Sequence, residues 1–259
     1  MGNVIQINQL QKSYGNHQVL KGIDLHIEAG QVIGYIGPNG AGKSTTVKIL
    51  IGLDAQFEGE VLVKGVNIKD DPLAVKKTIG YIPENADLYE VLTPIEFLKL
   101  IGRLHGLTDQ LIESRARQML NFLGLTELNE RMDTFSKGMR QKVLLVSGLL
   151  HDPEIIFLDE PLSGLDANSV ILVKEIIARL AKEGKTIFYC SHMMDVVEKV
   201  SDRIVLINDG NIVADGTFEE LKRQGGGSLE QIFSTLTGKT EQAASAEEFM
   251  SVFKSDEEE

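Results

Sequence analysis

The segment at residues 37–45 reads GPNGAGKST and decides the fold, because it matches the phosphate-binding pattern G-x-x-x-x-G-K-[ST]. Glycines in this pattern let the backbone approach a phosphate closely and point successive N–H groups at its oxygens. Lys43 supplies a mobile positive charge for the outer phosphates, and the Ser44 hydroxyl is placed to ligate Mg²⁺. The predicted nucleotide-binding residues are Gly37, Pro38, Asn39, Gly40, Ala41, Gly42, Lys43, Ser44 and Thr45.

The chain on either side of this loop has the context that the pattern requires. Residues 32–36 are almost entirely apolar, as expected of a strand that is covered on both faces. Residues 45–50 begin a helix, and a helix N-terminus favours anions. A chance glycine-rich turn would not need this strand–loop–helix order, so we interpret the segment as a nucleotide site.

Composition places the chain among globular proteins of one large or two small domains. It has 259 residues, of which 42% are hydrophobic and 25% charged. The net charge of −12 disfavours long-range attraction to nucleic acid, which we do not expect as a partner. The single cysteine, Cys190, cannot form an internal disulfide, which favours a reducing compartment. We predict no secretory signal, because the N-terminus lacks a basic region followed by a long apolar run, and no membrane span, because no apolar window reaches about 18 residues.

Periodicity predicts an α/β chain with a helical insert. Apolar runs or alternation predict strands at residues 4–10, 20–27, 32–36, 61–66, 79–82, 155–158, 187–190, 204–207 and 212–214. Thr93-Pro94 with Glu96 forms a capping-box signature, and Thr108 begins a second helical pattern. We therefore expect a helical region at about residues 90–150. Another helix is predicted from Val170 to Leu180.

The C-terminal part has a different character. Residues 225–227 are three glycines, which predict a flexible joint, and a short amphipathic helix follows within a unit at residues 225–238. Residues 239–259 are acidic and are predicted to be disordered. Apolar side chains interrupt this tail and offer a docking segment as the alternative to a solvated tail: Phe249, Met250, Val252 and Phe253.

Candidate catalytic groups follow the apolar strands. Asp159 and Glu160 end the strand at 155–158, at the edge of a parallel sheet where ligands bind. Adjacent residues point to different sides, so Asp159 is suited to hold Mg²⁺ and Glu160 to orient or deprotonate a water. His192 follows the strand at 187–190. It is interpreted either as a structural histidine or as a group that contacts the transferred phosphate.

Taken in order, the motifs resemble those of the ATP-binding subunits of ABC transporters. The segment FSKGMRQ at residues 135–141 is similar to the family signature LSGGQ. The segment SGLD at 163–166 is similar to the family's SALD/SGLD loop, and Ser191-His192 is similar to its switch histidine. Tyr14 matches the aromatic residue that stacks on adenine. The resemblance covers residues 4 to about 222 and is closest to bacterial exporter-type subunits.

The resemblance implies a fold, partners and further site residues. The fold is a P-loop NTPase core with a mainly parallel sheet, an N-terminal antiparallel β subdomain and an inserted α-helical subdomain, within a domain at residues 1–224. The helical subdomain docks an integral membrane permease, so the subunit is cytoplasmic and peripheral on the inner face of the cell membrane. Two copies, or two homologous subunits, pair head to tail, with Asp166 in the dimer loop. Each ATP then contacts the signature of the other copy through Ser136, Lys137, Gly138, Met139 and Gln141.

The chain departs from the family pattern at two places. Glu84 replaces the usual glutamine after Ile82-Pro83, and we expect its carboxylate to keep the role of a Mg²⁺ ligand. Lys137-Gly138-Met139 replaces Gly-Gly-Gln, but Ser136 and the second glycine are retained.

The predicted function is that of an ATPase that powers a transporter, most often an exporter in this group. One alternative is a soluble ABC-type ATPase that acts on DNA or ribosomes, although the chain has a single cassette and no heptad arm. The other is a nucleotide-gated regulator with low turnover, in view of Glu84 and Lys137.

Overall fold

The computed structural model describes residues 2–84, 88–225 and 227–238. The predicted acidic tail, its apolar residues and Gly226 lie outside these ranges. Within them, no helix combines the length and the apolar content that crossing a membrane requires.

The strands form two sheets. The strands are β1 (Asn3–Tyr14), β2 (His17–Glu28), β3 (Val32–Ile36), β4 (Glu58–Val63), β5 (Val66–Asn67), β6 (Ile79–Ile82), β7 (Ile155–Asp159), β8 (Thr186–Cys190), β9 (Arg203–Asn208) and β10 (Asn211–Gly216). One sheet has the order β2-β1-β4-β5 and is antiparallel, whereas the other has the order β10-β9-β3-β8-β7-β6. In the second sheet only the β9–β10 pair is antiparallel. The predicted fold class is therefore confirmed.

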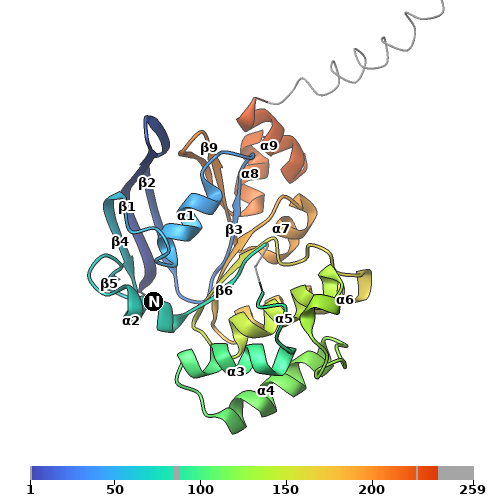
Figure 1. Ribbon diagram of the computed structural model, residues 1–259. Helices are drawn as coiled ribbons and strands as arrows, with labels where there is room; N and C mark the ends of the chain where they lie inside the picture. The colour runs from blue at the N-terminus through green and yellow to red at the C-terminus, as the bar shows by residue number, and fades with distance from the viewer. Residues whose placement is uncertain (1, 85–87, 226, 239–259) are drawn as a thin grey trace, which may run out of the picture.

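The helices cover the second sheet on both faces (Figure 1). They are α1 (Lys43–Leu50), α2 (Pro72–Thr78), α3 (Pro94–Leu104), α4 (Asp109–Phe122), α5 (Lys137–Leu149), α6 (Ala167–Lys182), α7 (Met194–Val200), α8 (Phe218–Gly225) and α9 (Leu229–Thr237), with a short 3₁₀ helix at Met132–Thr134. Figure 1 shows α1 beside the antiparallel sheet and α3, α4 and α5 grouped on the other side of the central strands.

Alternation along each central strand assigns its side chains to two cores. In β7, Ile155 and Phe157 pack with α1 and the antiparallel sheet, whereas Ile156 and Leu158 pack with the helices on the opposite face. A period of two is what a strand buried on both faces requires. The apolar runs that predicted β3, β7 and β8 therefore supply both cores at once.

The helical insert begins as the capping pattern predicts. The Thr93 side chain accepts a hydrogen bond from the Glu96 N–H, and the Glu96 carboxylate accepts one from the Thr93 N–H, at 3.3 and 2.9 Å. Thr108 caps α4 through the Leu111 N–H. The division of the chain into domain, joint and tail stays a prediction.

Three helices have no counterpart in the prediction. They are α2, α7 and α8, which have seven, seven and eight residues. Helices this short carry about two turns of apolar periodicity, which is too little to stand out from the surrounding sequence. N-terminal signals were present for α2, where Asp71 caps the helix and Pro72 follows it, and for α8, where Thr217 and Glu220 form a capping box.

Candidate nucleotide site

The predicted site residues gather at one edge of the six-stranded sheet. The loop at residues 37–45 follows β3, and Ser191 and His192 follow β8. Asp159 ends β7, and Pro83 and Glu84 follow β6. Because β3, β8, β7 and β6 are adjacent and parallel, their carboxyl ends meet at this edge. Segments more than a hundred positions apart in the chain are thereby brought together.

The phosphate loop has a shape that two of its glycines make possible. A Cβ atom at Gly37 would lie 2.2 Å from the Ile207 carbonyl oxygen, so no side chain fits there. Gly42 has a φ of 108°, a left-handed conformation that favours glycine, and it is the N-cap of α1 without any side-chain cap. The first N–H groups of α1 therefore have no capping side chain and are available to an anion.

A cavity of about 370 Å³ opens over this loop. Six of the predicted nucleotide-binding residues line it: Asn39, Gly40, Gly42, Lys43, Ser44 and Thr45. His17 and Val19 from β2 also line it, and the sequence offered no motif that would have found them. The Lys43 ammonium donates to the carbonyl oxygens of Gly37 and Pro38, at 2.6 and 3.1 Å. The loop backbone thus holds this cation at the cavity.

Three carboxylates crowd the neighbouring strand ends. Burial, followed by the negative charges of Glu160 and Glu84, raises the pKa of Asp159 to about 6, and the positive charge of Lys43 opposes this. Burial lowers the pKa of Lys43, whereas the nearby carboxylates raise it. The structure therefore brings Glu84 close enough to Asp159 for their charges to interact, as the predicted shared metal site requires.

This crowding suits a bound cation that is shared with the substrate. Among the described residues, no three His, Cys, Asp or Glu side chains are grouped closely enough to hold a metal by themselves. Mg²⁺ commonly takes only one or two carboxylates and completes its shell with phosphate oxygens and water. Asp159, Glu84 and the Ser44 hydroxyl fit that donor chemistry, and a divalent cation would relieve the repulsion that disfavours the Asp159 carboxylate.

Glu160 is held by the residues that follow β8. Its carboxylate accepts hydrogen bonds from the Ser191 hydroxyl at 2.8 Å, and from the His192 N–H and the His192 Nδ1–H at 2.7 Å each. Its backbone has a φ of 48°, a strained conformation for a residue with a side chain. Its N–H donates to the Cys190 carbonyl, which stabilises this conformation. Sequence spacing found Glu160 and His192 separately, and the structure joins them.

Tyr14 lies at the end of β1, near the phosphate loop. Its side chain is 48% exposed, and its hydroxyl donates to the Asp54 carboxylate at 2.8 Å. The Asp54 position, in the segment after α1, was not among the predicted site residues. An exposed aromatic ring at this place is available to stack on a base.

The signature segment begins α5 on a different part of the chain. Ser136 caps the helix by accepting from the Met139 N–H at 3.2 Å. A Cβ atom at Gly138 would lie 2.7 Å from the Gly164 carbonyl oxygen, which explains why the second glycine is retained. Lys137 donates to the Ser163 hydroxyl at 2.8 Å, so the lysine that departs from the family pattern ties the signature to the SGLD loop.

Gln141 does not lie with the other signature residues. Its side chain is 2% exposed and donates to the Pro161 carbonyl oxygen at 3.2 Å. In the single chain its amide therefore faces the protein interior, and its predicted contact with a nucleotide on a second copy stays a prediction. Helical spacing already placed it on the apolar face, three and four positions before the buried Leu144 and Leu145. Met139 is half-buried and packs against the core.

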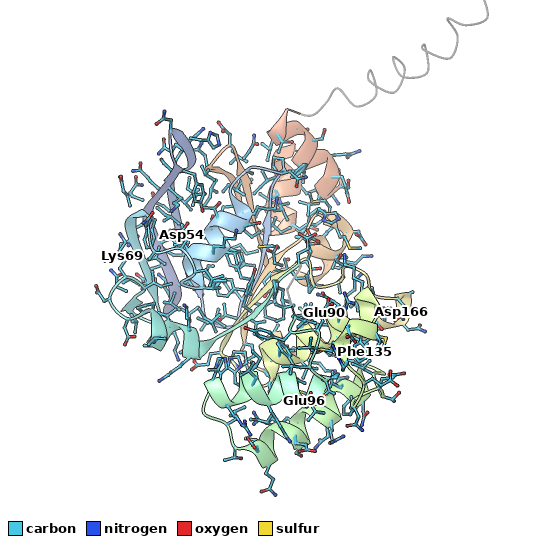
Figure 2. The ribbon with its side chains drawn as sticks, in the orientation of Figure 1. Asp54, Lys69, Glu90, Glu96, Phe135 and Asp166 are labelled. Carbon is cyan, nitrogen blue, oxygen red and sulfur yellow. The ribbon has the colours of Figure 1, made fainter. Side chains whose placement is uncertain are left out.

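Asp166 caps α6. Its carboxylate accepts from the Asn168 and Ser169 N–H groups at 3.0 Å each, and from the Ser169 hydroxyl at 2.6 Å. Hydrogen bonds from Ser169 lower the pKa of Asp166, so it is ionised at neutral pH. Figure 2 shows Phe135 and Asp166 on one side of the molecule and Asp54, the partner of Tyr14, on the other. The signature and the base-stacking end therefore cannot meet within one chain.

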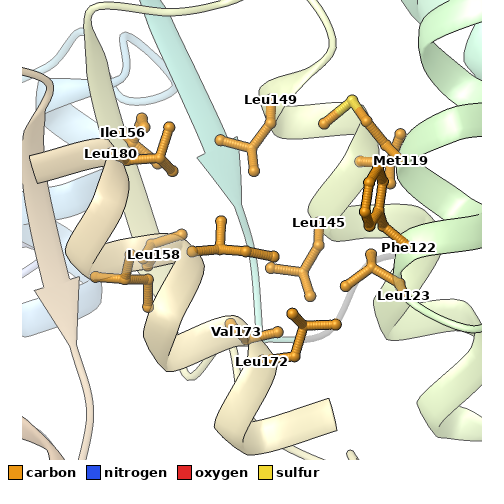
Figure 3. Close-up of a pocket in the computed structure, with 13 residues that line it drawn as sticks. Met119, Phe122, Leu123, Leu145, Leu149, Ile156, Leu158, Leu172, Val173 and Leu180 are labelled. Carbon is orange, nitrogen blue, oxygen red and sulfur yellow. The ribbon is translucent and has the colours of Figure 1, made fainter. Parts of the chain in front are cut away.

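A separate cavity of about 270 Å³ lies between the helical insert and the central sheet (Figure 3). Its lining is wholly apolar and comes from α4, α5, α6 and β7. Without a polar or charged group, it has nothing to bind a phosphate. The polar cavity over the phosphate loop, which is also the larger of the two, is therefore the candidate nucleotide site.

Comparison with known proteins agrees with the geometry. A family model described as "ABC transporter" matches residues 20–163. The linearmycin resistance ATP-binding protein LnrL of Bacillus subtilis (strain 168) is 36% identical over 237 residues, which are 91% of this chain and 76% of that protein. The daunorubicin/doxorubicin resistance ATP-binding protein DrrA of Streptomyces peucetius is 34% identical over 226 residues, which are 87% of this chain and 68% of that protein.

Solved structures show the same similarity. A structure described as an ATP-binding subunit of an ABC transporter superposes with a TM-score of 0.84 at 32% identity, covering 90% of this chain and 99% of the other. An ATP-binding cassette solved as a dimer, in a post-hydrolysis state with ADP and phosphate, gives a TM-score of 0.76 at 25% identity, covering 82% of this chain and 98% of the other. From its fold, its site and these matches, this chain belongs to the ABC transporter family, as an ATP-binding subunit that hydrolyses ATP and dimerises.

Proposed function

We propose that this subunit drives the export of a small molecule through a membrane-spanning permease. The observation that carries the proposal is the joining of Lys43, Asp159, Glu160 and His192 at one strand edge, with the signature on a separate side. Two of the relatives are named for resistance to linearmycin and to daunorubicin or doxorubicin, which favours export.

Each residue at the strand edge has a role that its chemistry supports. The α1 N-terminus and Lys43 bind the outer phosphates. Glu160 accepts a proton from, or orients, the attacking water, while Ser191 and His192 hold its carboxylate in place. Asp159, Glu84 and Ser44 would hold Mg²⁺, which when bound neutralises charge on the phosphates. Tyr14 stacks on the adenine.

The second half of the site comes from another copy. Ser136, Gly138 and Lys137 lie at the α5 N-terminus, which attracts anions, and the first turn of α5 has no acidic residue. In a head-to-tail pair, this end faces the phosphates bound by the partner subunit. ATP then contributes to the interface, so it favours the closed pair by binding it more tightly than the open one.

The helical insert offers the surface for the permease. Large apolar side chains are exposed on and near α3 and α4, namely Tyr89, Val91, Leu100, Leu104 and Phe122. Such side chains on one region are typical of an interaction surface. Docking there would hold the subunit at the inner face of the cell membrane, in the cytoplasm.

The test is the Glu160→Gln variant. Because glutamine cannot accept the proton, we expect hydrolysis to fall by about 10² to 10⁴-fold while ATP binding is retained. The variant should then accumulate as a dimer in Mg-ATP, measured by light scattering, and the exposed Glu183→Gln variant is the matched control. A monomeric Glu160→Gln protein at saturating Mg-ATP would contradict the proposal.

A permease partner needs its own experiment. The full chain, used as bait with detergent-solubilised membranes of its own organism, should capture an apolar multi-span protein, and the exposed Phe122→Asp variant should capture less of it. Capture that is equal for both would contradict docking at the helical insert. A soluble ATPase or a low-turnover regulator would instead be indicated by no membrane partner or by negligible Mg-ATP turnover, respectively.

A further inference from the structure

A buried ion pair lies directly behind the Tyr14 ring. Lys12 and Tyr14 are neighbours on the same face of β1, and Asp54 comes from the segment after α1. The Lys12 ammonium donates to the Asp54 carboxylate at 2.7 Å and also to the Gln56 carbonyl oxygen. The side chains of Lys12 and Asp54 are only 4% and 17% exposed. This pair is therefore fixed by its partners and by burial, unlike an ordinary surface pair.

The Lys12 side chain of this pair occupies one face of the Tyr14 ring. The Lys12 ammonium lies 4.7 Å from the ring centroid, within the range of a cation–π contact. With Lys12 on one face and 48% of Tyr14 still exposed, the opposite face is the one left for a flat ligand. A base that stacks on Tyr14 therefore has a single side from which to do so.

The Tyr14 hydroxyl is fixed as well. It donates to the Asp54 carboxylate at 2.8 Å and interacts with the Thr45 hydroxyl of α1. Partial burial and Asp54 raise the pKa of Tyr14, so the hydroxyl keeps its proton and remains a donor. Thr45 also lines the cavity over the phosphate loop. The hydroxyl thus fixes the ring relative to the element that receives the phosphates.

We propose that Lys12 and Asp54 are positioning residues, which hold Tyr14 in the orientation that receives the base of a nucleotide bound at residues 37–45. The inference rests on the proposed function, in which Tyr14 stacks on adenine. The physical gain is preorganisation. The ring has already lost its rotamer freedom before the nucleotide binds, so the free energy of nucleotide binding is not reduced by that loss. Neither residue belongs to the motifs by which the family was recognised.

The experiment measures dissociation constants for Mg-ATP and for inorganic tripolyphosphate, which has no base, on the full chain by calorimetry. Tyr14→Phe keeps the ring and the Lys12–Asp54 pair but removes the hydroxyl. We expect it to weaken ATP binding by about threefold to tenfold. Asp54→Asn, which removes the charge that holds Lys12, should weaken ATP binding by a similar factor. Neither variant should change the affinity for tripolyphosphate, because the phosphate loop is intact.

Tyr14→Ala separates the inference from the function on which it rests. If Tyr14→Ala weakens ATP binding but Tyr14→Phe and Asp54→Asn bind like the wild type, stacking stands and the positioning role is overturned. If Tyr14→Ala also binds like the wild type, base stacking itself is overturned. Equal weakening of ATP and tripolyphosphate would show a merely structural role and would likewise overturn the inference. The exposed Asp70→Asn variant is the matched control for Asp54→Asn and should bind both ligands like the wild type.

Discussion

The helices α1 and α5 both begin beside a glycine, yet their N-termini are completed in different ways. The α1 N-cap is Gly42, which has no side chain, so its first N–H groups have no capping partner from a side chain. The α5 N-cap is Ser136, which caps the helix by its own hydroxyl. Neither helix has an acidic residue in its first turn. Both ends attract anions, but the Ser136 hydroxyl already satisfies the Met139 N–H at α5, whereas no capping side chain satisfies an N–H group at α1.

The surroundings extend this difference. Near α1 the charge of Lys43 interacts with the carboxylates of Asp159 and Glu160, so positive and negative charge are concentrated together. At α5 two lysines contact the SGLD loop: Lys137 donates to Ser163 at 2.8 Å, and Lys142 lies 3.9 Å from the Asp166 carboxylate. We therefore propose that one chain carries a catalytic half at α1 and a recognition half at α5, and that the two halves function together across two copies.

Removing the cation of the catalytic half should have the largest effect. Lys43→Ala leaves the outer phosphates without their point charge, and we expect ATP affinity and hydrolysis to fall by at least about a hundredfold. Calorimetry and phosphate release measure the two. The control is Lys182→Ala, an exposed lysine at the end of α6. If Lys43→Ala still binds ATP like the wild type, the α1 N-terminus does not differ from the α5 N-terminus in the way we propose.

Removing the cap of the recognition half should separate hydrolysis from binding. Ser136→Ala should leave ATP binding to the single subunit within about twofold, because the signature acts only on a second copy. Hydrolysis should fall by about tenfold to a hundredfold. Thr108→Ala is the matched control, since it removes the same kind of cap from α4 and costs a similar ~1 kcal/mol of stability. An equal loss of hydrolysis in both variants would show that capping alone matters.

The crowded carboxylates predict a pH-dependent stability. The pKa of Asp159 is raised to about 6, so its contribution to stability is full below about pH 4 and is lost as the pH rises through about 6. Asp159→Asn should therefore be more stable than the wild type at pH 7.5, by about 1 kcal/mol after allowance for solvent screening. Urea unfolding of the nucleotide-free protein with a chelator, at pH 4.5 and 7.5, measures this. If the difference in unfolding free energy between Asp159→Asn and the wild type is the same at both pH values, the prediction is contradicted.

The smallest effect is expected at Glu84. If its oxygen ligates Mg²⁺, Glu84→Gln keeps an oxygen ligand and should retain ATPase activity within about threefold, whereas Glu84→Ala should lose about tenfold. ATPase rates over a range of Mg²⁺ concentrations measure this, and higher Mg²⁺ should partly restore Glu84→Ala. Wild-type rates in both variants would remove the metal role.

Local patterns predicted the elements that have strong local causes. The apolar runs at 32–36 and 79–82 match β3 and β6 to the residue, and the Thr93 capping box starts α3 as expected. These features depend on residues within a few positions of each other, so the sequence is sufficient to find them. The short helices α2, α7 and α8 were missed because each has only about two turns of apolar periodicity, although α2 and α8 carry capping residues.

Other features depend on contacts between distant segments. Nothing near Glu160 in the sequence indicates that Ser191 and His192 hold its carboxylate, or that its φ is positive. The burial of Gln141 against Pro161 and the support of Tyr14 by Lys12 and Asp54 are of the same kind. Each is set by which elements become neighbours, which is not a local property.

By itself, the sequence predicted which groups bind and hydrolyse a nucleotide: the loop at 37–45, Asp159, Glu160 and His192. Each of these groups lies at or just after the end of an apolar strand, and each strand is specified by its own local pattern. Only the tertiary structure decided that they meet, because the order β9-β3-β8-β7-β6 aligns the carboxyl ends of those units at one edge. The same order leaves the signature helix on another side, so the chain presents its two anion-binding ends apart.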